Sequence, residues 1–216
     1  MSLTGPTLLQ AYVDALREHA HWLIAEGYER MDKAAFAQAQ EPAITGELVR
    51  EMRSFLESGS GAPTWVSFFS IHDDPPLNVG GRLGRSRPRV DIEFERIAAG
   101  KRPRLRFEAK RLRSATRHTV ARYLGEEGLG CFLTGKYPAT HGEAGMLGYA
   151  QSDDEVTWAE RIASRLSRDE AKYGTVPPPF APQVVHAALR HTYVSHHLLA
   201  EGAVPIVIHH VMLRFG

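Results

Sequence analysis

The sequence predicts an α/β fold in which helices flank a mixed central β-sheet. Short runs alternate apolar and polar residues with the period of two that half-buried strands show. Other stretches repeat apolar residues at the spacing of an amphipathic helix. With 216 residues and 43% hydrophobic content, the chain can fill one compact core. We therefore expect a single domain over residues 1–216, made of an N-terminal helical extension (1–42), a core (43–170) and a C-terminal β-hairpin (184–216).

Helices are predicted before the first strand. Apolar residues recur at helical spacing over residues 7–26, and Gly27 is expected to end this helix. A shorter helical piece over 31–39 precedes an amphipathic helix over 43–57, for which Thr45 is a candidate N-cap.

Three strands are predicted next. Residues 64–71 are typical of a β-strand. The loop after it, residues 73–82, is rich in turn formers and basic residues and is a candidate substrate-gripping element. Strands over 90–95 and 105–110, separated by a turn through Gly100, are expected to pair as a hairpin.

The charged side chains of these two paired strands are expected on one side of the hairpin. They are Asp91, Glu93 and Glu95 in the first strand and Arg106, Glu108 and Lys110 in the second. Carboxylates beside an ammonium suit a site that binds a divalent cation and activates water for attack on a phosphodiester. A solvated charged face without function is the alternative.

Helices and strands alternate in the rest of the chain. We expect a helix over 111–124, a strand over 145–151, a helix over 155–168 capped by Asp153 or Asp154, a Pro-rich loop over 173–182, and a hairpin of 184–198 with 204–215 joined at Glu201-Gly202.

The spacing of Asp91 from the Glu108-Ala109-Lys110 triplet, together with the order of the elements around it, resembles the PD-(D/E)XK, or restriction-endonuclease-like, nuclease superfamily. The resemblance covers residues 43 to 125 and implies a restriction-endonuclease-like core. Val90 stands where the name-giving proline of the motif would be. The Gln-x-x-x-Tyr signature of some members is not matched, because Thr119 lies four residues before Tyr123.

The resemblance also implies a catalytic role for these residues. Asp91, Glu108 and the Ala109 carbonyl would hold Mg²⁺, with Mn²⁺ as its expected substitute, and Lys110 would position and deprotonate the attacking water. A depressed pKa of Lys110 would suit that step. Glu47, on the helix before the first strand, is the candidate for a further acidic residue at the metal. Its alternative role is a first-turn acid that interacts with the helix dipole.

Basic residues gather around the proposed site although the net charge of the chain is only +1. Between Arg82 and Arg117 the sequence has thirteen basic and four acidic residues. Such a field attracts a polyanion, and arginine favours bidentate phosphate contacts. We expect nucleic acid as the partner, with DNA favoured over RNA. Four arginines are expected to contact its backbone: Arg106, Arg111, Arg113 and Arg117.

The sequence therefore predicts a metal-dependent nuclease that acts in bacterial defence, restriction or repair. An endonuclease is favoured over an exonuclease. A non-catalytic nucleic-acid-binding or assembly subunit is the alternative. A third reading is a histidine-metal hydrolase using the C-terminal histidines, among which His209 and His210 are expected on opposite faces of a strand.

Location and assembly are predicted from what the sequence lacks. Neither a membrane span nor an export signal is visible, so we expect a cytoplasmic protein without a membrane partner. A homodimer or a partner subunit of a defence system fits a small nuclease. The lone Cys131 excludes an internal disulfide and is expected to be a buried, inert thiol.

Overall fold

Seven strands form one sheet in the structure, a computed structural model that describes residues 5–57, 62–97, 102–114, 116–198 and 205–216. The strands are β1 (Phe69–Asp73), β2 (Ile92–Arg96), β3 (Arg104–Leu112), β4 (Glu143–Ala150), β5 (Thr175–Pro182), β6 (Thr192–His197) and β7 (Ile206–Arg214). Their order across the sheet is β1-β2-β3-β4-β7-β6-β5.

The sheet is mixed, with its parallel pairs at the centre. β4 pairs in parallel with both β3 and β7, whereas the outer pairs on each side are antiparallel. The prediction of an α/β fold with a mixed sheet flanked by helices is therefore confirmed.

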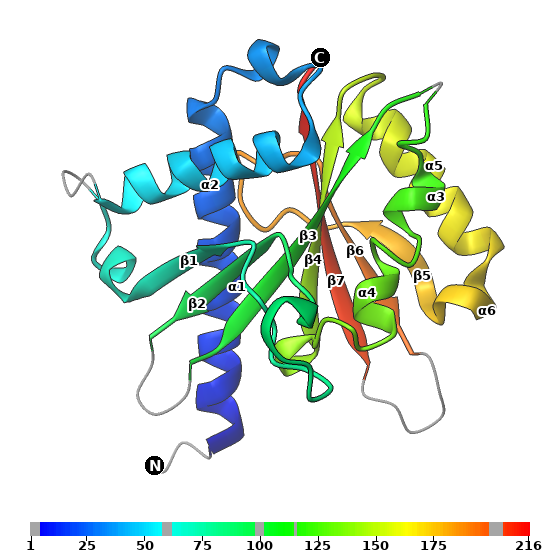
Figure 1. The fold of residues 1–216 in the computed structure, drawn as a ribbon. Coiled ribbons are helices and arrows are strands. Elements are labelled where there is room, and N and C mark those ends of the chain that lie inside the picture. Colours follow the sequence, from blue (N-terminus) through cyan, green and yellow to red (C-terminus); the bar gives the residue numbers. More distant parts are fainter. Residues whose placement is uncertain (1–4, 58–61, 98–101, 115, 199–204) are drawn as a thin grey trace.

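Helices cover both faces of this sheet (Figure 1). The helices are α1 (Gly5–Arg30), α2 (Glu41–Glu57), α3 (Val120–Tyr123), α4 (Gly130–Leu133), α5 (Glu155–Arg168) and α6 (Glu170–Tyr173). One apolar cluster joins α1 and α2 to one face of the sheet, and a second joins α3, α4 and α5 to the other. Because side chains alternate along a strand, β3 supplies Phe107 to the first cluster and Leu112 to the second. No helix among the described residues combines the length and apolarity needed to cross a membrane.

The N-terminal helix runs further than predicted. α1 continues through Gly27 to Arg30, so the prediction that Gly27 ends it is wrong. A Cβ atom at Gly27 would lie 2.6 Å from Cγ of Met52. Gly27 therefore permits a close approach of α1 to α2. The helical piece expected over 31–39 is a 3₁₀ turn at Lys33–Phe36.

The first predicted strand begins later than expected. Residues Thr64–Phe68 form a 3₁₀ helix, and β1 starts only at Phe69. Trp65 stacks on His19 with ring centroids 4.0 Å apart and also packs against Trp22. The aromatic residues that favoured a strand are thus used to pack this turn onto α1.

The helix predicted over 111–124 is mostly absent. β3 runs on through Leu112, because Arg111 and Leu112 pair with Tyr149 and Ala150 of β4. Only α3 remains of the expected helix. The Glu108-Ala109-Lys110 triplet consequently lies within a strand that continues beyond it.

The Pro-rich segment predicted as a loop is strand β5. It pairs with β6 only near its two ends, with a register shift between Val176 and Ala181. β5 is an edge strand, where proline is tolerated because one side needs no backbone donors.

Several predictions agree with the structure. β4 matches the strand predicted over 145–151, and α5 has the predicted bounds, with Asp154 accepting a 2.7 Å hydrogen bond from the Thr157 N–H. β6 and β7 form the predicted antiparallel pair, although β6 begins at Thr192 rather than 184. Cys131 is buried. The predicted turns at Gly100 and Glu201-Gly202 lie outside the described residues.

Candidate active site

The candidate site lies where β2 and β3 separate. The two strands pair from Glu95 with Arg104 to Ile92 with Phe107. Asp91 immediately precedes β2, and its carboxylate accepts a 2.6 Å hydrogen bond from the Ala109 N–H. The predicted pairing of the two strands is therefore confirmed, and it brings Asp91 beside the Glu108-Ala109-Lys110 triplet.

Beyond this point, backbone N–H groups of β3 donate hydrogen bonds to side-chain carboxylates instead of to β2. Asp91 accepts from the Ala109 N–H, and Glu41 accepts from the Arg111 N–H at 3.1 Å. Glu41 is the first residue of α2, so the start of this helix is held against β3. Backbone donors left without a strand partner thus fix two acidic side chains at the site.

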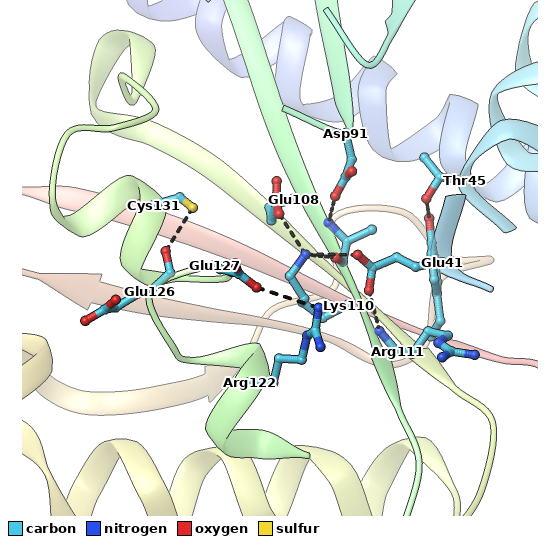
Figure 2. A network of polar contacts seen from close by, with 12 residues as sticks. Glu41, Thr45, Asp91, Glu108, Lys110, Arg111, Arg122, Glu126, Glu127 and Cys131 are labelled. Atoms are coloured by element: carbon cyan, nitrogen blue, oxygen red, sulfur yellow. Dashed lines mark hydrogen bonds and ion pairs between the residues drawn. The ribbon is translucent and has the colours of Figure 1, made fainter. Parts of the chain in front are cut away.

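The ammonium of Lys110 lies among the acidic side chains, as Figure 2 shows. Its Nζ donates to Glu108 at 2.7 Å, to Glu41 at 3.0 Å and to the Ala109 carbonyl at 2.6 Å. Lys110 and Glu108 are both buried. The structure therefore gathers Asp91, Glu108 and Lys110 as predicted and adds Glu41.

Burial and mutual repulsion perturb the carboxylates. Burial first and the nearby Asp91 second raise the pKa of Glu108 to about 8, against the attraction of Lys110. Burial also raises the pKa of Asp91, although Lys110 and the Ala109 N–H oppose this shift. At neutral pH the protein without a bound cation therefore keeps Glu108 largely protonated, beside the Asp91 carboxylate.

Lys110 responds in the opposite direction from the prediction. Burial disfavours its charged form, but the attraction of Glu108, Glu41 and Asp91 outweighs burial and raises the pKa of Lys110 above its usual value. The predicted depressed pKa is therefore wrong for the protein without a bound cation, in which Lys110 is an ammonium.

The acidic residue that α2 brings to the site is Glu41, not Glu47. Glu47 forms an ion pair with Arg50 one turn along the helix. Sequence reasoning placed the start of this helix at residue 43 and so left Glu41 outside it. Pro42 was the available signal, because proline is favoured in the first turn of a helix.

The donor set fits a hard divalent cation. Oε2 of Glu108 is buried and has no hydrogen-bond partner among the residues that the structure describes. A buried carboxylate oxygen without a partner is costly, and a cation would satisfy it. Asp91, Glu108 and Glu41 offer only oxygen ligands, which Mg²⁺ prefers.

Two of the four arginines predicted to bind phosphate are used inside the protein. Arg106 is buried and donates to Glu93 at 2.7 Å and to the Pro138 carbonyl at 2.7 Å. Arg111 is buried and donates to the Ala39 carbonyl at 2.9 Å. Both guanidinium groups make internal contacts, so the structure does not present Arg106 and Arg111 on the surface where they were predicted to contact phosphate.

The other two arginines are more accessible. Arg113 and Arg117 follow β3, and Arg117 is exposed. Within the described ranges, neither guanidinium has a hydrogen bond or ion pair. Arg113 and Arg117 therefore remain candidates for phosphate contacts.

A second acidic group lies at the other end of the same strand pair. Ligand atoms of His72, Glu93 and Glu95 all lie within 4.8 Å of one another, closer than the carboxylate oxygens of the candidate site. Both carboxylates are already paired with guanidinium groups, those of Arg102, Arg104 and Arg106. A cation here would have to displace arginines, so the group is better explained as an ion-pair network that joins the strands.

The C-terminal histidines form a different kind of network. Ser195 Oγ lies 2.7 Å from Nε2 of both His197 and His210, and all three residues are buried. His197 Nδ1 contacts the Tyr173 carbonyl, and His210 Nδ1 contacts the Tyr123 hydroxyl. With neutral imidazoles, only one order of donation satisfies every group: Tyr123 to His210, His210 to Ser195, Ser195 to His197, and His197 to the carbonyl.

His209 lies on the opposite face of β7, as predicted. Its Nε2 lies 3.0 Å from Glu143, while the neighbouring His210 contacts Tyr123 and Ser195. In the described part of the chain, no C-terminal histidine belongs to a group spaced to hold a metal ion. The geometry therefore gives the histidine-metal alternative no support.

No family model, no curated protein and no solved structure matches this chain. The resemblance to the PD-(D/E)XK superfamily therefore depends on the residues and geometry of the site alone.

Proposed function

We propose that the protein is a metal-dependent endonuclease that hydrolyses phosphodiester bonds of nucleic acid, with DNA favoured over RNA as its substrate. The supporting observation is the convergence of Asp91, Glu108 and Glu41 around the buried Lys110, with one oxygen of Glu108 lacking a hydrogen-bond partner among the described residues. Burial and the nearby Asp91 raise the pKa of Glu108, so this carboxyl holds a proton at neutral pH when no cation is bound. A divalent cation would replace that proton and favour the carboxylate.

Asp91, Glu108 and the Ala109 carbonyl, with Glu41, are the groups that would hold Mg²⁺. Bound there, Mg²⁺ would lower the pKa of water and neutralise charge that develops on the phosphate. Asp91 is held in place by the Ala109 N–H, and Glu41 by the Arg111 N–H. These contacts orient the carboxylates before any ligand arrives, which is the arrangement that favours catalysis.

Lys110 is proposed to place positive charge at the reacting phosphate. Its ammonium contacts Glu108, Glu41 and the Ala109 carbonyl, so it also sets the spacing of these oxygens. Since the site keeps Lys110 charged, its direct contribution is hydrogen-bond donation and electrostatic stabilisation. Arg113 and Arg117, which follow β3, are proposed to contact the phosphates on one side.

The test is cleavage of supercoiled double-stranded DNA, circular single-stranded DNA and RNA, with Mg²⁺, Mn²⁺ or EDTA. We expect metal-dependent cutting of circular DNA by the wild type and none by Lys110→Ala. Glu47→Gln is the matched control, since it changes an acid of the same helix outside the site. Absence of cutting by wild type on every substrate, or full activity in Lys110→Ala, would contradict the proposal.

A non-catalytic nucleic-acid-binding subunit is the second candidate. The observation that favours it is the Lys110 ammonium itself, which bonds to two carboxylates without any cation. Salt-sensitive DNA binding that is identical in Mg²⁺ and EDTA, without cleavage, would select this candidate.

A further inference from the structure

An arm, residues 74–90, leaves the sheet after β1 and returns at Asp91. Its two sides are joined by a 2.8 Å hydrogen bond from the Leu77 N–H to the Pro88 carbonyl and by a bridge between Pro76 and Arg89. Leu77 and Val90 are buried in the cluster beneath α3 and α4. In Figure 1 the arm lies in front of the sheet beside α4. The arm is therefore anchored at its base.

The tip of the arm has a defined conformation. The Ser86 hydroxyl donates to the Leu83 carbonyl at 2.7 Å, and Arg87 donates to the Asn78 side chain at 2.9 Å. Gly80 and Gly84 have φ of 61° and 58°, which glycine adopts without the strain that a side chain would add. These contacts hold the tip in one shape.

The tip presents an apolar side chain between two arginines. Leu83 is 83% exposed, more than any other large hydrophobic residue that the structure describes. Arg82 and Arg85 are exposed, and neither guanidinium has a hydrogen bond or ion pair within the described ranges. By contrast, Arg87 and Arg89 lower in the arm are paired with side chains.

We propose that this tip binds duplex DNA, with Arg82 and Arg85 on the phosphates and Leu83 inserted as a wedge between neighbouring bases. An exposed leucine gains little in water but is buried when it enters a base stack, as apolar wedges of DNA-bending proteins do. Guanidinium groups on both sides would offset the charge of the backbone that the wedge must approach. This inference rests on the proposed nuclease function and names its substrate as duplex DNA.

The position of the arm relates the wedge to the site. Leu83 and Asp91 are eight positions apart in the chain, and a chain of that length spans at most about 28 Å. One turn of DNA is about 34 Å long. The wedge would therefore act within roughly one helical turn of the scissile phosphate. Lys136, which together with Arg82 and Pro88 lines a cavity of about 270 Å³ between the arm and the chain after α4, adds positive charge nearby.

The experiment is DNA binding with Ca²⁺ in place of Mg²⁺ to suppress cleavage, using short duplexes that contain several 2-aminopurine bases. We expect wild type to raise 2-aminopurine fluorescence, because unstacked bases are brighter. Leu83→Ala should abolish this rise and weaken binding about tenfold. Val184→Ala is the matched control, since Val184 is also exposed, at 62%, but lies between β5 and β6. It should behave as wild type.

A pre-opened duplex sharpens the test. A single mismatched base pair removes part of the unstacking cost, so wild type should bind it more tightly than a fully paired duplex. Leu83→Ala should lose this preference. Arg82→Gln and Arg85→Gln should each lower the slope of log affinity against log salt concentration by about 0.9. Arg190→Gln, which changes an exposed arginine between β5 and β6, should leave it unchanged.

The outcomes separate the wedge from the nuclease. If Leu83→Ala gives the same fluorescence and affinity as wild type, the wedge is wrong, whether or not Mg²⁺ supports cleavage. If the fluorescence rise depends on Leu83 but wild type never cuts DNA, the wedge stands and the nuclease proposal fails. The wedge is also wrong if the wild type binds no duplex. It is wrong as well if Leu83→Ala leaves DNA binding unchanged and instead abolishes binding of a protein partner.

Discussion

Two acidic clusters lie at opposite ends of the β2 and β3 pair, and their counter-charges differ. At one end, Glu93 and Glu95 face several guanidinium groups, those of Arg102, Arg104 and Arg106. At the other end, Asp91, Glu108 and Glu41 surround the single ammonium of Lys110.

The difference separates an ion-pair network from a candidate site. Carboxylates that are matched by arginines join neighbouring strands and need nothing further. At the candidate site three carboxyl groups surround one ammonium, and Oε2 of the buried Glu108 has no hydrogen-bond partner among the described residues, which costs free energy in the absence of a ligand. Such a cost is expected where a protein prepares a site for a cation.

Removal of Lys110 should have the largest effect. In Lys110→Ala the buried Glu108 and its neighbours Asp91 and Glu41 lose the Lys110 ammonium, which should lower the free energy of unfolding in EDTA by about 3–5 kcal/mol and cleavage by at least about 1000-fold. Urea denaturation and plasmid cleavage measure the two effects. Arg104→Ala, at the other cluster, should cost at most about 1 kcal/mol because Arg104 is 41% exposed. Equal losses of unfolding free energy in Lys110→Ala and Arg104→Ala would contradict the proposed difference between the two clusters.

The second prediction compares two acids of α2. Glu41→Gln should reduce cleavage about 100-fold, because it weakens a ligand group at the site, whereas Glu47→Gln should stay within about twofold of wild type. Initial rates over a range of Mg²⁺ concentrations measure the difference, with a raised Mg²⁺ requirement expected for Glu41→Gln. A larger loss of cleavage in Glu47→Gln than in Glu41→Gln would instead identify Glu47 as the acid of α2 that acts at the site.

The third prediction asks which cluster binds the cation. Mg²⁺ at about 100 times its dissociation constant should stabilise the wild type by about 2.7 kcal/mol. Glu108→Gln should abolish this gain, and Glu95→Gln should retain it. Thermal unfolding with and without Mg²⁺ gives the measurement. Loss of the gain only in Glu95→Gln would place the cation at His72, Glu93 and Glu95.

The fourth prediction concerns a buried group away from both clusters. Burial lowers the pKa of His21 to about 3, from 6.5. Because the unfolded chain takes up this proton near pH 6.5 and the folded protein does not, the contribution of His21 is fully present above pH 6.5 and is lost as pH falls. His21→Gln should make stability less dependent on pH between about 6 and 4, by about 1.4 kcal/mol per pH unit. Denaturation at several pH values measures the slope of unfolding free energy against pH. An unchanged slope in His21→Gln would contradict the assignment of a neutral His21 in the folded protein.

Alternation of apolar and polar residues predicted the pairing of β2 with β3 correctly. It brought Asp91, Glu108 and Lys110 together because local period and strand pairing agree there. Glu41 was missed because a contact between residues 41 and 110 depends on how α2 docks on β3. β5 was missed because its prolines are typical of a loop, and only its partner β6 makes it a strand. The end of β3 was read as helix because its pairing with β4 lies outside any local window.

The hydrogen-bond row from Tyr123 through His210, Ser195 and His197 to the Tyr173 carbonyl has a single direction. No member can exchange its donor and acceptor alone, since that would set two protons or two lone pairs against each other at the next contact. Reversal of the whole row is excluded as well, because the Tyr173 carbonyl at its end can only accept a hydrogen bond. The row therefore behaves as one unit, and it ties the two short helices α3 and α6 to the same pair of strands.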